Sequence, residues 1–189
     1  MLLVWCRTRL LWTICSCHRI LLMKAENIIK IELQHAHEVL CLIKEAIVEM
    51  ERQNIYQWDD VYPDHNTIIA DISSGGMFGV FKNGNLAGIV VLDKNQPPEY
   101  STIKWESGAS IPLVMHRLCV RPKFQGQGIA KQLLTFSEQF AINNSFNSII
   151  LDAFSGNPAA INLYENNGYL KKGAVAFRKG EFYCYKKLI

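Results

Sequence analysis

The chain has 189 residues, a length that fits one globular domain. Apolar residues make up 49% of it and charged residues 20%, a composition that excludes wholesale disorder. No apolar stretch reaches the roughly 20 residues that a membrane-spanning helix needs, so we expect no membrane partner. Residues 1–22 hold three arginines and no acid, and the rest of the chain balances 17 basic against 17 acidic side chains. This balance leaves no basic face, and we expect no nucleic-acid partner.

Residues 1–22 differ in composition from the remainder of the chain. Arg7 and Arg9 precede an apolar run, as in a signal peptide, but the run is short and no small-residue cleavage site comes after it. Met23 opens a polar pattern that is ordinary for a soluble protein. We therefore expect residues 1–22 to be an N-terminal extension, either a mis-assigned start or an accessory helix, and residues 23–189 to form a single domain.

The six cysteines include no CxxC pair, which argues against a zinc ribbon or a thioredoxin-like site. We expect reduced thiols in a cytoplasmic protein. His37 and Cys41 lie one helical turn apart, but two ligands are too few for a metal, and no metal is expected.

Apolar spacing and turn residues predict the elements of the chain in order. They are a strand at 28–33, helices at 35–52 and 64–73, strands at 77–82, 86–93 and 111–120, a helix over 126–140, a strand at 148–154, a helix over 157–167, and strands at 169–172 and 181–188. Asn83-Gly84 predicts a type I′ hairpin turn, and residues 95–110 have no clear period. This order is typical of the α/β or α+β class, in which helices cover the faces of a mixed sheet.

The segment from Pro122 to Ala130 is the most informative part of the sequence. A strand ends at the proline, and a turn with glycines at 126 and 128 leads into a helix. Free N–H groups and the helix dipole favour an anion there, and glycine lets a ligand approach the main chain, which together predict a pyrophosphate site. A Walker loop fits poorly, because the segment does not supply the pattern GxxxxGK[ST]. A dinucleotide fingerprint also fits poorly, because Lys131 stands where the third glycine of GxGxxG belongs.

Two motifs in this order resemble those of the GCN5-related N-acetyltransferases (GNAT family). The first is Val120-x-Pro122 with Gln125-x-x-Gly128-x-Ala130, and the second is the set Asn157, Ala160, Tyr164, Gly168 and Tyr169. The resemblance covers most of residues 23–189. It implies a mostly antiparallel central sheet with helices on both faces and a splay between two central parallel strands. It also implies transfer of the acetyl group of acetyl-CoA, a co-substrate, directly to an amine through a tetrahedral intermediate.

The resemblance further implies which residues bind the carrier. The cofactor-binding residues would be Leu118, Cys119, Val120, Gln125, Gly126, Gln127, Gly128, Ile129, Ala130, Asn157 and Tyr164. Tyr164 would protonate the leaving thiolate, and a backbone N–H near Cys119 would stabilise the oxyanion. Cys119 itself is expected to pack as a small core residue rather than to act as a nucleophile.

The general base and the acceptor pocket are less well defined. His116 titrates in a useful range and is our candidate base, with a side chain expected to face away from that of Cys119. Glu106, Asp59, Asp60 and Asp152 are other candidates, and a water chain would need no residue at all. Aromatic and acidic residues are expected to line the acceptor pocket, namely Trp58, Tyr62, Glu106 and Tyr183.

We thus expect an acetyltransferase whose acceptor is a small amine or a lysine-like or N-terminal amine. The oligomeric state stays open, and a homodimer is one candidate. Two other interpretations remain. One is a catalytically silent module that binds coenzyme A as a sensor or an interaction surface. The other is an enzyme with a different acyl donor, such as succinyl-CoA.

Overall fold

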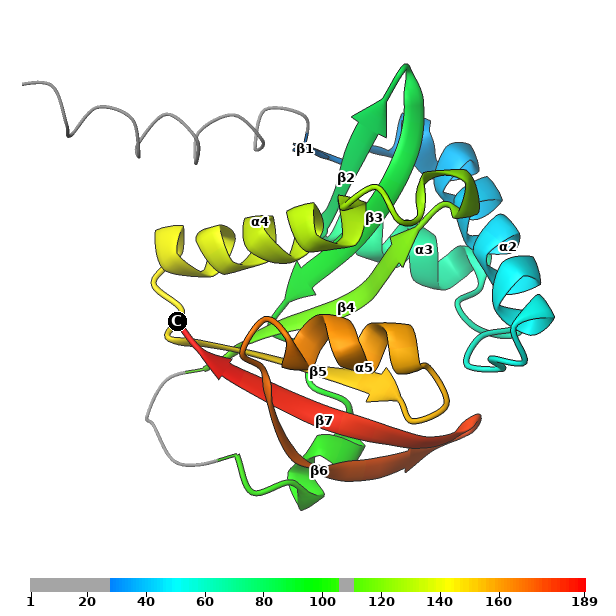
Figure 1. The fold of residues 1–189 in the computed structure, drawn as a ribbon. Helices are drawn as coiled ribbons and strands as arrows, with labels where there is room; N and C mark the ends of the chain where they lie inside the picture. The colour runs from blue at the N-terminus through cyan, green and yellow to red at the C-terminus, as the bar shows by residue number, and fades with distance from the viewer. Residues whose placement is uncertain (1–27, 106–110) are drawn as a thin grey trace, which may run out of the picture.

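The structure, a computed structural model, describes residues 28–105 and 111–189. In these residues seven strands form one sheet in the order β1-β2-β3-β4-β5-β7-β6 (Figure 1). The strands are β1 (Ile28–Lys30), β2 (Met77–Lys82), β3 (Asn85–Asp93), β4 (Leu113–Val120), β5 (Ser148–Phe154), β6 (Leu170–Phe177) and β7 (Gly180–Leu188). The α-helices are α2 (Ala36–Arg52), α3 (His65–Ser73), α4 (Ile129–Asn143) and α5 (Pro158–Glu165). No described helix has the length and apolar composition needed to cross a membrane.

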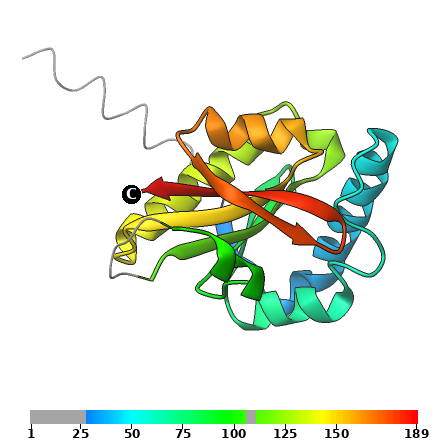
Figure 2. The same cartoon turned by 90° about the horizontal axis from the view of Figure 1, so that it is seen from below.

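Helices cover both faces of the sheet, as predicted. Figure 2 shows α5 on one side of the strands and α3 on the other. The apolar stripe of α2 buries Leu42 and Ile43 against one face, and α4 buries Leu133 and Leu134 against the opposite face. Every strand pair except β4–β5 is antiparallel, so the expected mixed and mostly antiparallel sheet is confirmed.

Local turn chemistry accounts for most element boundaries. Asn83 and Gly84 have φ angles of 52° and 72°, which confirms the type I′ turn between β2 and β3. Several predicted boundaries are wrong, and the helix predicted over 126–140 spans Ile129–Asn143 instead. The strand predicted at 28–33 ends at Lys30, and the strand predicted to end at residue 172 continues to Phe177. β6 contains residues of low strand propensity such as Gly173, and its length is set by pairing along β7.

The two parallel strands in the middle of the sheet separate soon after they meet. β4 and β5 are paired at Leu113↔Ile149 and Val114↔Ile150, and these described strands form no further pair with each other. Beyond that point β4 stays with β3, and β5 stays with β7. The predicted splay is therefore confirmed, and it leaves the facing edges of both strands without a partner strand.

A β-bulge at Arg117 changes which side chains share a face of β4. Arg117 has a φ of 49°, and His116 pairs with Val91 while Cys119 pairs with Ile89. Arg117 and Leu118 of β4 thus lie opposite the single residue Val90 of β3. Paired residues share a face, so His116 and Cys119 point to the same side, and the expectation that they face opposite ways is wrong.

Packing of α4 on the sheet can be tested by truncating one helix residue at a time. Leu133 is fully buried, whereas Ile142 on the same helix is 56% exposed. We expect Leu133→Ala to lower the free energy of unfolding by about 2–5 kcal/mol, because it leaves a cavity in the core. Ile142→Ala should change it by less than about 0.5 kcal/mol. Urea denaturation measures both, and equal losses would contradict the packing described.

Candidate active site

Two adjacent cavities, each of about 510 Å³, lie at the splay between β4 and β5. The hairpin cavity is bounded by the β6–β7 hairpin, and the turn cavity by the turn at 125–128 and the start of α4. Residues of β4, α5 and the α2–α3 connection line both cavities, namely Gln57, Trp58, Leu118, Asn157, Ala160 and Tyr164. A ligand that crosses this junction would reach from one cavity into the other.

The glycine turn presents main-chain atoms to the turn cavity. Gly126 and Gly128 have φ angles of 71° and 80°, and a Cβ atom on either would meet nothing within 4 Å. The N–H of Gln132 donates to the carbonyl of Gly128 at 3.0 Å, so the N–H groups before it precede the first hydrogen bond of α4. The Gln127 side chain is held away, since its Oε1 accepts from Lys82 Nζ at 2.6 Å. The turn can therefore hold an anion through its backbone.

β4 supplies one wall of the turn cavity through Leu118, Cys119 and Val120. Among the described strands, none pairs here with the edge of β4 that faces β5, so its backbone groups are available to an extended ligand. Burial raises the pKa of the Cys119 thiol to about 12. A thiol of this kind stays protonated, which fits a packing role and not that of a nucleophile.

Asn157, the N-cap of α5, and Tyr164, within α5, are two of the five residues of the second sequence motif. The Asn157 Oδ1 accepts the N–H of Ala160 at 3.1 Å, and its Nδ2 donates to Gln57 Oε1 at 2.9 Å. Asn157 is therefore both the helix N-cap and an anchor for the α2–α3 connection. Tyr164 is 7% exposed, and burial together with the charge of Asp152 raises the pKa of its phenol above the usual value. The phenol is neutral across the working pH range.

The α2–α3 loop, comprising residues 53–64, is tied down beside the cavities at three points. Besides the contact of Gln57 with Asn157, Asp59 accepts hydrogen bonds from Arg178 Nη2 at 2.6 Å and Lys179 Nζ at 3.2 Å. Arg178 and then Lys179 hold the pKa of Asp59 below its usual range, so this carboxylate stays ionised and paired. It is a poor general base.

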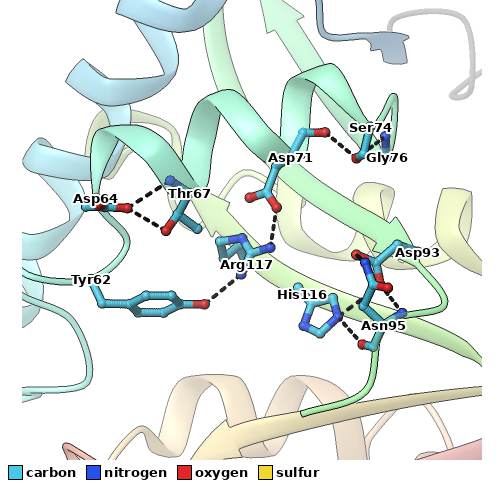
Figure 3. Close-up of polar contacts among 10 residues, drawn as sticks. All are labelled: Tyr62, Asp64, Thr67, Asp71, Ser74, Gly76, Asp93, Asn95, His116 and Arg117. Atoms are coloured by element: carbon cyan, nitrogen blue, oxygen red, sulfur yellow. Dashed lines mark hydrogen bonds and ion pairs between the residues drawn. The ribbon is translucent and has the colours of Figure 1, made fainter.

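The third tether belongs to a buried polar network on β4 (Figure 3). Arg117 Nη1 donates to the hydroxyl of Tyr62 at 2.6 Å, and Nη2 donates to Asp71 Oδ1 on α3 at 2.6 Å. Because both acceptors are fixed by other elements, they hold the bulged residue of β4 in its left-handed conformation.

His116 lies beside this network and lines the hairpin cavity. Its Nε2 is 3.2 Å from Asp93 Oδ1 and 3.1 Å from the carbonyl of Asn95 (Figure 3). Both of these atoms are acceptors, so Nε2 carries the hydrogen in the neutral ring, and Nδ1 keeps the lone pair. The arrangement leaves His116 able to accept one proton, with a carboxylate beside the resulting cation.

The structure brings two of the four expected acceptor residues together. Trp58 and Tyr62 line the hairpin cavity, whereas Tyr183 lines neither cavity and lies beneath the ammonium of Lys171, 2.9 Å from its ring centroid. Its neighbour Phe182 lines the hairpin cavity. The period-two pattern of β7 shows that these two residues point to opposite faces, but it does not say which face holds the cavity. Glu106 lies outside the described residues.

Comparisons with known proteins agree on one family. The family model described as Acetyltransferase (GNAT) family matches residues 43–169. An uncharacterized N-acetyltransferase, YesJ of Bacillus subtilis, is 29% identical over 123 residues, which cover 64% of this chain and 68% of that protein. Two rat proteins of the N-acetyltransferase 8 group also match, and the chain spans less than half of each.

Solved structures share the fold at low sequence identity. A GNAT-family acetyltransferase from Streptococcus agalactiae has a TM-score of 0.75 and 24% identity, covering 86% of this chain and 94% of its own. PaiA N-acetyltransferase from Thermoplasma acidophilum, solved in complex with coenzyme A, has a TM-score of 0.66 and 14% identity, covering 86% and 98%.

The glycine turn offers a matched pair of substitutions. Gly126 and Gly84 have nearly equal φ angles, 71° and 72°, and neither has an atom near a built Cβ, but only Gly126 lines the turn cavity. Gly126→Ala and Gly84→Ala should therefore destabilise the fold equally, by about 1 kcal/mol. We expect only Gly126→Ala to weaken coenzyme A binding, by roughly tenfold in calorimetry, because its methyl group keeps the ligand off the amides. Equal affinities in the two variants would argue against the turn as the phosphate site.

Proposed function

The chain belongs to the GNAT acetyltransferase family, and on that premise we propose that it transfers the acetyl group of acetyl-CoA directly to a primary amine. The observation that carries this proposal is the meeting of two cavities at the β4–β5 splay, with Tyr164 lining both. A carrier and an acceptor that enter from opposite sides would meet at this junction. Direct attack needs this proximity and no covalent enzyme intermediate.

The turn cavity would hold the carrier. The amides of Gly126–Ala130 would bind the pyrophosphate, and the pantetheine arm would run along the unpaired edge of β4. The thioester would then lie between Leu118 and Tyr164, at the junction. Support for this carrier comes from the glycine geometry and from the solved neighbour that contains coenzyme A.

The hairpin cavity would hold the amine, which must lose a proton before it can attack. An ammonium has no lone pair and a pKa near 10.4, so a base is needed at neutral pH. His116 would accept this proton at Nδ1, and Asp93 would stabilise the imidazolium. The amine nitrogen then attacks the thioester carbonyl carbon, and a backbone N–H near Cys119 would donate to the oxyanion.

Tyr164 would protonate the leaving sulfur as the C–S bond breaks. A thiolate released into a poorly solvated cavity is more basic than in water, because burial disfavours the charged form. Tyr164 lines both cavities and its phenol is neutral, so it is placed to supply the proton as the C–S bond breaks. The nitrogen then sheds its second proton through solvent, which restores Tyr164, and His116 returns its proton to solvent.

Replacing Tyr164 tests the acid. We expect Tyr164→Phe to lower kcat by roughly 100-fold and to leave the Kd of coenzyme A within about threefold. Tyr185→Phe is the control, since that phenol packs 6.1 Å from the Tyr164 ring but donates to Glu165 and lines neither cavity. Steady-state kinetics over the full pH range would refute the assignment if both variants turned over equally.

Replacing His116 tests the base through pH. We expect His116→Gln to lower kcat/KM by roughly 100-fold at pH 7, and the defect to shrink as pH rises towards 10. The defect shrinks at high pH because a growing share of the amine is already neutral and needs no base. His65→Gln on α3, away from both cavities, should behave like the wild type. A defect that stays constant with pH would exclude His116 as the base.

The alternative is a catalytically silent module that binds coenzyme A. A panel of primary amines with acetyl-CoA separates the two functions, because only the enzyme releases a stoichiometric thiol for each amide formed. Binding of coenzyme A without thiol release on any amine, in a protein that is folded by thermal melting, would favour the silent module.

A further inference from the structure

Asp152 on β5 is a charged residue of the hairpin cavity that has no part in the proposed transfer mechanism. Val114 and Ile150 form the last pair between β4 and β5. Two residues further along each strand, on the same face, stand His116 and Asp152. They therefore occupy the two sides of the splay, opposite each other, at the point where the acceptor amine must enter.

The charge of Asp152 lacks the compensation that the neighbouring aspartates have. Asp59, Asp71 and Asp93 each contact a basic side chain. For Asp152, in the described part of the chain, the contact is a hydrogen bond from the Tyr100 hydroxyl to Oδ2 at 2.7 Å. A neutral donor leaves a buried carboxylate with an unbalanced charge.

The ionisable groups around Asp152 do not compensate the negative charge of its carboxylate. Burial raises the pKa of its carboxyl, and the nearby exposed carboxylate of Glu99 adds to the rise. His116 and Arg117 oppose it, but Arg117 already pairs with Asp71. The phenols of Tyr100 and Tyr164 and the thiol of Cys184 also feel this charge, and each is neutral. Burial favours the neutral acid, and a cation entering the cavity would stabilise the ionised carboxylate of Asp152 and bind to it.

Aromatic rings form one part of the hairpin cavity's wall. Phe154 and Phe182 have ring centroids 5.3 Å apart, and Phe177 packs edge-on to Phe182 at 5.1 Å. Trp58 covers the junction side and is 8% exposed. These rings would bury an apolar body and favour a cation close to their faces.

The basic residues of the cavity disfavour other kinds of amine. Arg178 and Lys179 line it near the hairpin, and Arg117 lines it near the splay. A second ammonium, as in a diamine, would find Asp59 already paired with Arg178 and Lys179. The other carboxylate of the lining, Glu99, is exposed, and an exposed ion pair contributes little. An α-amino acid would bring its own carboxylate within a few ångström of Asp152, while the guanidinium of Arg117 is already occupied.

We propose that the acceptor is a monoamine with an apolar or aromatic body, and that the carboxylate of Asp152 binds its ammonium group. This inference rests on the proposed acetyl transfer and names its substrate class. Asp152 fixes the nitrogen between the two sides of the splay, within reach of His116, while the phenylalanine rings hold the body. Tyr100 acts as a positioning residue that orients the carboxylate.

The first test compares acceptors with the wild-type protein. The probes are 2-phenylethylamine, 1,4-diaminobutane, phenylalanine and a tripeptide with a free N-terminus, each with acetyl-CoA. We expect kcat/KM for 2-phenylethylamine to exceed each of the others by at least tenfold. A preference for the diamine, the amino acid or the peptide would overturn the proposal. A protein that binds no acetyl-CoA or acetylates none of the probes would instead refute the proposed function.

The second test removes the charge. Asp152→Asn should raise KM for 2-phenylethylamine by roughly 10–100-fold, since a hydrogen bond to a charged group is lost. The Kd of coenzyme A should not change, which also reports that the variant is folded. Glu181→Gln, an exposed carboxylate of β7 outside both cavities, is the charge-matched control and should leave KM unchanged. An equal KM in the two variants would overturn the role of Asp152. If Asp152→Asn fails to bind coenzyme A, the inhibition of the wild-type protein is measured instead. We expect 2-phenylethylamine derivatives with a charged nitrogen to bind tenfold better than 2-phenylethanol, and equal inhibition by the two would overturn the role of Asp152.

Discussion

The separation of β4 from β5 after two residue pairs is the constraint on which the site depends. In a sheet that paired throughout, the edges of both strands would be occupied by each other, and neither cavity would exist. The separation is possible because each strand keeps its other neighbour, β3 for β4 and β7 for β5. Backbone groups that face the opening are then satisfied only when a ligand or water is present. The fold thus uses an unsatisfied edge as its recognition element.

Burial and pairing determine which ionisable groups around this opening are charged and which are neutral. Tyr164 and Cys119 stay neutral because the opening is poorly solvated, so one can donate a proton and the other is inert. Asp59 forms ion pairs with Arg178 and Lys179 of the β6–β7 hairpin, and these pairs hold the α2–α3 loop in place. Asp152 has a carboxylate in the same poorly solvated region, where the described residues give it a hydrogen bond from Tyr100 and no basic partner. Asp59 is paired with two basic side chains and Asp152 with a neutral hydroxyl, so only Asp152 keeps a carboxyl that can bind an entering cation.

Local signals in the sequence predict the part of the site that is built from contiguous residues. The glycine turn before α4 and the Asn157 cap of α5 are recognisable because backbone conformation and capping depend on residues a few positions apart. Contacts across the sheet are different. Gln57 reaches Asn157 and Asp59 reaches Arg178 over about a hundred residues of chain, and no spacing rule connects them. The prediction of Tyr183 as a cavity residue is wrong, and Phe182 takes that place, because alternation along the strand puts the two on opposite faces without showing which face holds the cavity.

The bulge at Arg117 has a consequence for how relatives of this chain are aligned. One additional residue in β4 exchanges the two faces of the strand for everything that precedes it, so His116 reaches the opening only because that residue is present. A relative that lacks the insertion would turn the equivalent histidine into the opposite layer while keeping the glycine turn intact. For such a relative, counting backwards from the glycines would match His116 to a residue on the other face of the strand, whereas aligning the strands on the bulge would keep the faces matched.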